Sequence, residues 1–162
     1  MKTAVPFFFS LMLLFIGNMA CKTDEGLEPV QAGAATNNNA NASDTVSTRI
    51  RIKIGTRAFT ATLLNNATAA AFKARLPLTI AMKELNGNEK FADLPNELPR
   101  NASNPGTIQA GDLMLYGSNT LVLFYETFRT SYSYTKLGRI DNPSGLAAAV
   151  GSGSVTVTFE LE

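Results

Sequence analysis

From Thr48 onward, apolar and polar residues alternate with a period of two, and this pattern constrains the fold more than any other feature of the chain. In residues 49–54, an isoleucine at every second position alternates with Arg or Lys, as in a β-strand with one buried face. The pair Gly55-Thr56, with glycine first, suits a type II′ turn. Residues 57–63 then return with apolar side chains on one face, so the sequence predicts a β-hairpin here.

Two segments of the same region favour helix. Residues 67–76 are rich in alanine, carry apolar residues at helical spacing and follow Asn66, a favourable N-cap residue. The proline after residue 76 ends this helix. A second helix is predicted to open at Asn142-Pro143, a cap residue followed by proline at the first helical position, and to end at Gly151.

The remaining apolar segments predict further strands. One starts at Leu78 and ends at the turn dipeptide Asn86-Gly87, and the others span 113–116, 121–126, 131–140 and 155–161. The continuous apolar runs at 113–116 and 121–126 suggest strands buried on both faces. Residues 92–111 contain three prolines and little periodicity, so we expect a long loop there. About seven or eight strands with two short helices indicate a mainly β fold, a closed or nearly closed β-barrel.

This fold assigns a set of apolar residues to the core and leaves one candidate ligand groove. The expected core residues are Ile50, Ile52, Phe59, Leu63, Phe72, Ile80, Met82, Leu123, Val155, Val157 and Phe159. Tyrosines offer apolar area with a polar tip, which suits a groove for a peptide or a small planar ligand. The candidate groove residues are Arg100, Tyr116, Tyr125, Tyr132, Tyr134, Lys136 and Arg139. The alternative is that these aromatic residues are partly core and partly ordinary strand surface.

Glu89 and Asp93 flank the proline-rich loop and form a candidate carboxylate pair. Paired carboxylates are the catalytic groups of many glycosidases, which makes a hydrolase a further alternative. Nothing in the sequence determines the separation of these two carboxylates.

Composition excludes several classes of function. The chain has 14 Lys and Arg against 13 Asp and Glu, which removes the simplest electrostatic case for nucleic-acid binding. It has no His, so Ser–His–Asp sites, Cys–His dyads and His-ligated metals are excluded. Its single Cys excludes intrachain disulfides and cysteine-rich zinc sites. With no glycine-rich phosphate loop either, we expect no metal and no cofactor.

Residues 1–20 have the composition of a secretory signal peptide. Lys2 is followed by an apolar run over residues 4–16, whose 13 residues make about 20 Å of helix. That length falls short of the roughly 30 Å hydrocarbon core of a bilayer. A buried helix at the extreme N-terminus is the alternative interpretation.

The segment that closes this run, residues 18–21, resembles the lipobox of bacterial lipoproteins. In that motif a small residue precedes a cysteine that is diacylated and becomes the mature N-terminus; Ala20 and Cys21 match it, whereas Asn18 replaces the usual Leu or Val. Several acyl chains together supply stable anchoring. The resemblance implies a lipoprotein anchored to a membrane of the bacterial cell envelope through Cys21, facing the periplasm or the exterior. A free thiol after an ordinary signal peptide is the alternative.

Residues 21–47 are predicted to be a flexible tether between this anchor and the barrel domain of residues 48–162. The segment is rich in Asn, Ala and Thr and has no aromatic residue, so it cannot bury enough apolar area to offset chain entropy. As a random coil it would span roughly 25–30 Å. Residues 22–25 are similar to the surface-export signals of some Bacteroidetes lipoproteins, with a plain solvated linker as the alternative.

Residues 48–162 resemble the bacterial cyclophilin-like domain family. The motifs that carry the resemblance are FTATL at 59–63, NATA at 66–69, LPL at 76–78, ELNGNEKF at 84–91, GDLMLY at 111–116, LVLFY at 121–125 and SYSYTKLGRI at 131–140. The resemblance implies a cyclophilin-type barrel capped by two short helices, which agrees with the strand count. The resemblance also suggests peptidyl-prolyl isomerase activity as an alternative function.

In true cyclophilins, a Pro-Gly…Gln-Gly-Gly-Asp stretch follows a Phe-His-Arg triplet whose arginine polarises the prolyl amide. Residues 105–112 resemble the stretch, but Arg100 lies one position off the place of that arginine, and the chain has neither His nor Trp. We therefore expect a monomeric, non-catalytic module that binds a peptide or small ligand, with a peptidyl-prolyl isomerase as the alternative.

Overall fold

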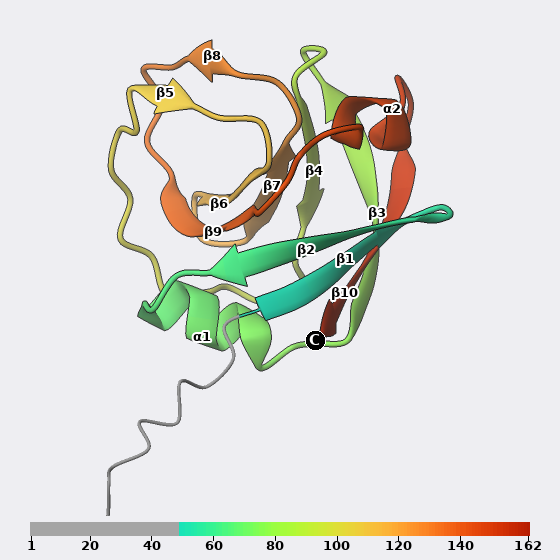
Figure 1. Cartoon of the computed structure of the whole chain (residues 1–162). Helices are drawn as coiled ribbons and strands as arrows, with labels where there is room; N and C mark the ends of the chain where they lie inside the picture. The colour runs from blue at the N-terminus through green and yellow to red at the C-terminus, as the bar shows by residue number, and fades with distance from the viewer. Residues whose placement is uncertain (1–48) are drawn as a thin grey trace, which may run out of the picture. The chain divides into compact units, whose positions relative to one another are not determined.

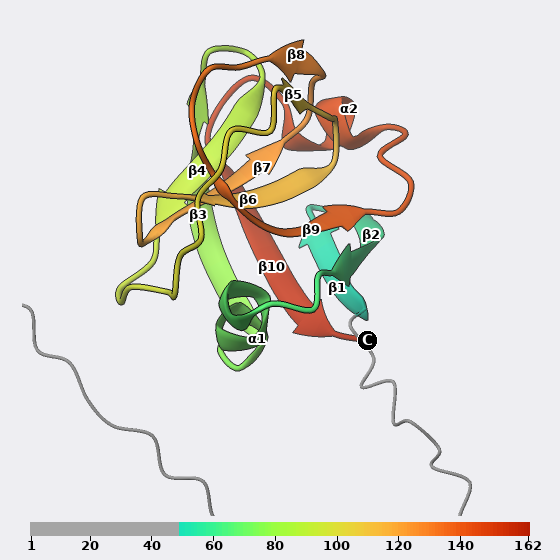
Figure 2. The same cartoon turned by 90° about the vertical axis from the view of Figure 1, so that its left-hand side faces the viewer.

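The computed structural model describes residues 49–162; the predicted signal peptide, the lipidation site at Cys21 and the tether lie outside this range. Eight antiparallel strands close into a barrel in the order β1-β10-β3-β4-β7-β6-β9-β2 (Figures 1 and 2). These strands are β1 (Arg49–Ile54), β2 (Arg57–Leu63), β3 (Leu78–Leu85), β4 (Glu89–Asp93), β6 (Asp112–Tyr116), β7 (Thr120–Phe124), β9 (Thr135–Ile140) and β10 (Val155–Leu161). The predicted mainly β, closed barrel is confirmed.

Turn chemistry determines the two tight hairpins. At the β1–β2 turn, Gly55 has a φ of +57° while Thr56 keeps a negative φ, as a type II′ turn requires. At the β3–β4 turn, Asn86 and Gly87 both have positive φ, at 56° and 68°, which is the type I′ pattern. Strand β4, which this second turn introduces, was not among the predicted strands.

The helices α1 (Ala67–Lys73) and α2 (Leu146–Val150) lie at opposite ends of the barrel (Figures 1 and 2). Asn66 caps α1 as predicted, because its side-chain oxygen accepts a hydrogen bond from the Ala69 amide at 2.8 Å. The helix ends at Lys73, three residues before the predicted end. The amides of Arg75 and Leu76 bond three residues back, and a residue that precedes a proline, as Leu76 does, disfavours helical geometry.

Helix α2 begins later than predicted. The Asn142 side chain accepts a hydrogen bond from the Ser144 amide, so Asn142-Pro143 forms a turn instead of a helix start. Gly145, at the N-cap, has a left-handed φ of 80° that separates this turn from the helix. Gly151 ends α2 as predicted.

Other strand boundaries differ from the prediction. The strand expected over residues 131–140 begins only at Thr135, and the strand expected over 121–126 ends at Phe124. The expected loop at 92–111 starts after β4 and contains β5 (Thr107–Ile108), which pairs with β8 (Phe128–Arg129). This two-stranded arm lies outside the barrel.

The described residues form two apolar clusters, one on each side of the barrel wall. The interior cluster contains every predicted core residue, although Ile80 and Val155 are only partly buried. The outer cluster consists of Ile108, Met114, Val122, Phe124 and Tyr134, with Phe91 and Phe128 packed against it. Because successive residues of a strand point to opposite faces, β6 and β7 contribute to both clusters, and their continuous apolar sequence follows from this.

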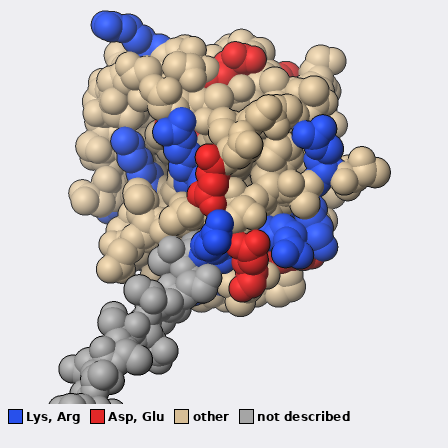
Figure 3. All heavy atoms as spheres, in the orientation of Figure 1, with Lys and Arg blue, Asp and Glu red and all other residues tan. Residues whose placement is uncertain are grey.

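The charged groups of the described surface are mixed in sign. On the face in Figure 3, Lys and Arg side chains are interleaved with Asp and Glu. Strands β1 and β10 carry exposed ion pairs such as Lys53–Glu160 at 2.8 Å, which contribute little to stability. Neither helix of residues 49–162 has the length and apolar character needed to cross a membrane.

Candidate functional site

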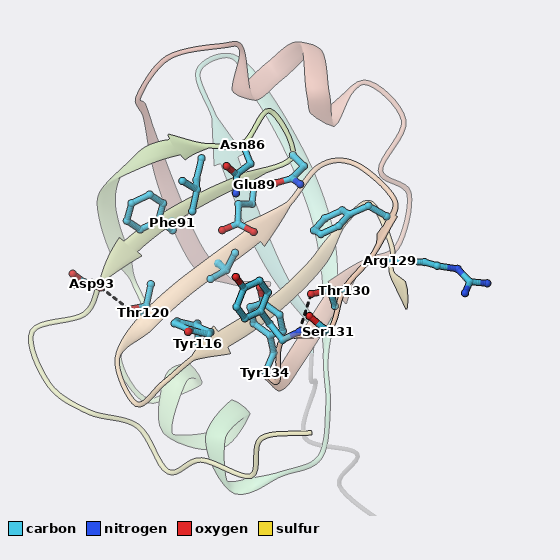
Figure 4. A pocket seen from close by; sticks show the side chains of 15 residues that line it. Asn86, Glu89, Phe91, Asp93, Tyr116, Thr120, Arg129, Thr130, Ser131 and Tyr134 are labelled. Carbon is cyan, nitrogen blue, oxygen red and sulfur yellow. Dashed lines mark hydrogen bonds between the residues drawn. The ribbon is translucent and has the colours of Figure 1, made fainter. Parts of the chain in front are cut away.

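A cavity of about 600 Å³ opens on the outer side of the barrel, next to the outer cluster (Figure 4). Its walls come from β4, β6 and β7, from the β3–β4 turn and from the segment 128–134. Five aromatic residues line it, namely Phe91, Tyr116, Phe128, Tyr132 and Tyr134. Its remaining lining residues are Leu85, Asn86, Asn88, Glu89, Asp93, Thr120, Val122, Arg129, Thr130 and Ser131.

The aromatic rings form a continuous series from the outer cluster to solvent. Tyr134 packs edge-on against Phe124, with ring centroids 5.4 Å apart, and is 6% exposed. Tyr116 contacts Tyr134 at 5.6 Å and Tyr132 at 6.3 Å between centroids. Tyr132, at the outer end, is 61% exposed. The inner rings are therefore held by packing, whereas the outermost is free to meet a ligand.

Backbone pairing positions the buried end of this series. Residue 134 forms an isolated bridge to Ser103 through two hydrogen bonds of 3.0 Å, so two long loops meet there. The pKa of the Tyr134 hydroxyl is raised to about 12, mainly by burial and then by the nearby Glu89. Tyr134 therefore stays protonated at neutral pH.

Glu89 lines the middle of the cavity, and Figure 4 shows its carboxylate directed into the hollow. The residue is 8% exposed, yet within residues 49–162 its carboxylate has no hydrogen-bond or ion-pair partner. Burial, followed by the neighbouring Glu84 charge, raises the pKa of Glu89 to about 7. A shifted titratable group in a cleft marks a functional-site candidate.

The neighbouring Lys90 does not neutralise Glu89, because its side chain points to the opposite side of the barrel wall. Lys90 is fully buried, and its Nζ donates to Glu84 and, at 2.7 Å each, to the carbonyl oxygens of Gly151 and Gly153. Burial would raise the pKa of Glu84, but hydrogen bonds from Lys90, Tyr125 and the Gly87 amide hold it below its ordinary value. Lys90 and Glu84 thus form a satisfied pair inside the barrel.

Of the seven predicted groove residues, the structure brings together Tyr116, Tyr132 and Tyr134 in the cavity. Tyr125 lies elsewhere, since its hydroxyl donates to Glu84 at 2.9 Å; burial and this bond raise its pKa to about 12. Arg139 is exposed on β9, 3.7 Å from Asp112.

Arg100 and Lys136, the other two predicted groove residues, line a second hollow of about 320 Å³ beside the start of α1. The lining of that hollow includes Asn66, Thr68 and Pro99 but no aromatic side chain. The seven residues expected to form one groove therefore lie in separate parts of the barrel.

Sequence reasoning did not assign Glu89, Phe91 or Phe128 to the ligand groove. Glu89, Phe91 and Asp93 share the outer face of β4 because they alternate along it. The Asn86-Gly87 turn was the sequence signal for strand β4, because a type I′ turn after one strand requires a second strand on its other side. No pattern in the sequence indicated that Phe128 lines the cavity, because its position depends on the pairing of β8 with β5.

Glu89 and Asp93 both line the cavity but do not form a close pair. Four residues apart on one strand, their Cα atoms are separated by roughly 13 Å. Asp93 also accepts a hydrogen bond from the Thr120 hydroxyl at 2.7 Å. Glycosidase carboxyl groups face each other about 5–9.5 Å apart, whereas Figure 4 shows Asp93 at the edge of the cavity and Glu89 in its middle, so the structure gives no support for two-carboxylate hydrolysis. Within residues 49–162, no group of three or more acidic or other metal-ligating side chains is placed to hold a metal ion.

An eight-stranded antiparallel barrel with a helix at each end and a cavity on its outer wall defines the class of the cyclophilin-like fold. The model of the cyclophilin-like family matches residues 52–160, and the chain belongs to this family. The solution structure of a hypothetical protein from Archaeoglobus fulgidus is similar, with a TM-score of 0.56 and 18% sequence identity, covering 72% of this chain and 96% of that one. This likeness concerns the fold alone. A comparison with curated proteins gave no match.

Proposed function

We propose that the protein is a non-catalytic binding module whose ligand, a peptide or a small molecule, occupies the aromatic cavity. The observation that carries this proposal is a preformed hollow of about 600 Å³ lined by rings from three separate parts of the chain. Ligand sites are typically concave, about 300–1,000 Å³ in volume, and lined by apolar and aromatic groups with a few polar ones. The outer tyrosines supply contact area at low entropic cost.

The binding experiment uses a screen of small-molecule fragments and short peptides against the purified protein, read by thermal shift and by chemical-shift changes. Tyr132→Ala is the informative variant, because Tyr132 is exposed at the mouth of the cavity and its loss should leave the fold intact. Leu161→Ala is the matched control, since Leu161 is also a large exposed apolar residue and lies outside the cavity lining. A ligand that binds equally to wild type and Tyr132→Ala would contradict binding at this site.

Peptidyl-prolyl isomerase activity is the second candidate, favoured by family membership and by the segment 105–112. Such an enzyme must lower a barrier of about 18–20 kcal/mol with a donor aimed at the prolyl amide in an apolar pocket. Arg100, the candidate donor, lies in a hollow without aromatic rings, and this placement supports the binding proposal. We expect no acceleration of cis–trans exchange in an X–Pro peptide. An acceleration that Arg100→Ala abolishes would favour the isomerase over the binding module.

We further propose that Cys21 is lipidated and holds the barrel near a membrane of the bacterial envelope as a monomer. The lipobox-like residues and the tether-like composition of residues 21–47 support this anchor. Growing cells with labelled palmitate should label the wild type but not Cys21→Ala, and only the wild type should fractionate with the membrane. Membrane fractionation of Cys21→Ala would overturn this assignment.

A further inference from the structure

The aromatic cavity holds a carboxylate that the fold leaves without a donor. Glu89 is more than nine-tenths buried, and its carboxylate is directed into the hollow (Figure 4). Buried polar groups normally find partners, so this lone carboxylate calls for a donor from outside the chain.

The groups around Glu89 supply no positive charge. Strand β3 brings Glu84, whose charge is already bonded to Lys90, and β4 itself adds Asp93 and directs Lys90 to the other side of the wall. After β7, Tyr125 lies within electrostatic reach of Glu89 and Glu126, although neither Tyr125 nor Glu126 lines the cavity. Further along come the phenol groups of Tyr132 and Tyr134, which do line it. β6 brings Tyr116.

Arg129 is the only Lys or Arg among the residues that line the cavity, and Figure 4 shows that its guanidinium points away from Glu89. The aromatic rings add to the negative character of the hollow, because the face of each ring carries partial negative charge. Cations are attracted to such faces, most strongly where water is excluded. The cavity therefore combines an unpaired carboxylate and several ring faces, all of which favour a cation with N–H donors.

We propose that this cavity selects an organic ammonium ion, whose N–H groups donate to Glu89 and whose apolar body packs among the tyrosine and phenylalanine rings. The inference rests on the proposed binding function and names the chemical class of its ligand. A charge-assisted hydrogen bond is about twice as strong as a neutral one, so the charge should favour the ammonium over a neutral analogue by at least about tenfold.

Binding should depend on pH through Glu89. The ammonium binds the ionised carboxylate, and the pKa of the free Glu89 carboxyl is about 7. Affinity should therefore rise as the pH increases through 7 and become constant above it, while falling about tenfold per pH unit well below it. An alkylammonium group, with an ordinary pKa of about 10.4 as in lysine, stays charged throughout this range.

The test uses the purified full chain and two probes of nearly equal shape, 2-phenylethylamine and its neutral analogue 2-phenylethanol. Affinities are measured by calorimetry, and the site is located by chemical-shift changes, at about one pH unit above and below the Glu89 pKa. We expect the amine to bind at least about tenfold more tightly than the alcohol at the higher pH. This preference should shrink at the lower pH, whereas the affinity for the alcohol stays constant.

Glu89→Gln tests the assignment, because it keeps the shape of the side chain and removes its charge. The variant should bind the two probes equally and lose the pH dependence. Glu97→Gln is the matched control, since it removes one carboxylate at an exposed position outside the cavity lining, and it should behave as the wild type.

Two results would overturn the inference in different ways. If the alcohol binds in the cavity as tightly as the amine, or more tightly at low pH, Glu89 does not select a cation, although the binding function stands. If neither probe shifts the resonances of the cavity at millimolar concentration, both the inference and the proposed binding site fail.

Discussion

At the scale of single residues, Glu89 and Lys90 are neighbours in the chain but belong to opposite sides of the barrel wall. Both are almost fully buried. Lys90 meets one carboxylate and two carbonyl oxygens, so its charge is well compensated, whereas Glu89 faces an aromatic cavity without any partner in the described part of the chain. The two charges cannot compensate each other, because successive residues of a strand point to opposite faces.

Glu89 should make the stability of the protein depend on pH. Folding raises the pKa of Glu89 from 4.5 to about 7, so the folded state favours the protonated carboxyl. The contribution of Glu89 to the free energy of unfolding is therefore complete below pH 4.5 and is lost as the pH rises through 7, by up to roughly 3 kcal/mol. Glu89→Gln should be the more stable form above pH 7.

Urea unfolding of the wild type and Glu89→Gln over a series of pH values measures this difference. The gap between the two proteins should widen from pH 4.5 to above pH 7, whereas Glu97→Gln should follow the wild type. A constant gap would show that Glu89 titrates at the same pH in the folded and unfolded chains.

At the scale of elements, the barrel closes through a narrow contact between β2 and β9. Only three residue pairs join these strands, Ala61–Ile140, Thr62–Arg139 and Leu63–Gly138. A Cβ atom at Gly138 would collide with the carbonyl oxygen of Thr62 and lie 2.9 Å from the Cα of Leu63. Glycine is thus required at residue 138 by the close approach of two backbones, which is a common reason for glycine inside a strand.

Gly138→Ala should therefore destabilise the barrel. The backbone atoms that the new methyl group meets cannot move without separating β2 from β9, so we expect a loss of about 1–3 kcal/mol or more in the free energy of unfolding. Gly153→Ala is the control, because a Cβ there would meet nothing within 4 Å, and its effect should stay within about 0.5 kcal/mol. Equal stability of the two variants in urea would refute this account of the contact between β2 and β9.

At the scale of the whole molecule, the described domain has two apolar clusters that share the strands between them. The interior cluster is closed at one end by α1, where Phe72 and Phe159 meet edge to face with centroids 5.5 Å apart. The outer cluster is covered by the β5–β8 arm, and the cavity is the part of that outer face that the arm leaves open. The fold therefore places the proposed ligand site on the outer wall, apart from the barrel interior.

Residues 48–162 should fold alone as a monomeric, β-rich barrel. Phe159 is fully buried in the interior cluster, so Phe159→Ala should cost about 3–5 kcal/mol through lost burial and the cavity it leaves. Denaturant unfolding measures the cost, sedimentation gives the oligomeric state, and far-ultraviolet circular dichroism reports the secondary structure. A helix-dominated spectrum, or no loss of stability in the variant, would contradict the architecture.

The sequence by itself determined the features that depend on a few neighbouring residues. The Gly55-Thr56 turn, the Asn66 cap and the end of α2 at Gly151 all follow from local backbone preferences and hydrogen bonds, and the structure confirms them. Strand alternation likewise predicted the barrel, and all the residues assigned to its core belong to the interior cluster or pack against it, because burial on one face imposes a period of two. The motifs along the chain indicated the family.

The tertiary structure alone decided the composition of the candidate site. Strand β4 was missed because two charged residues, Glu89 and Lys90, occupy its buried positions. The groups that compensate the buried charge of Lys90 come from β3 and from the residues after α2. Three of the predicted tyrosines share the cavity while Arg100 lies in another hollow, because strand order and the β5–β8 pairing bring distant segments together. The raised pKa of Glu89 has the same origin, since burial and charge proximity depend on contacts that sequence spacing does not contain.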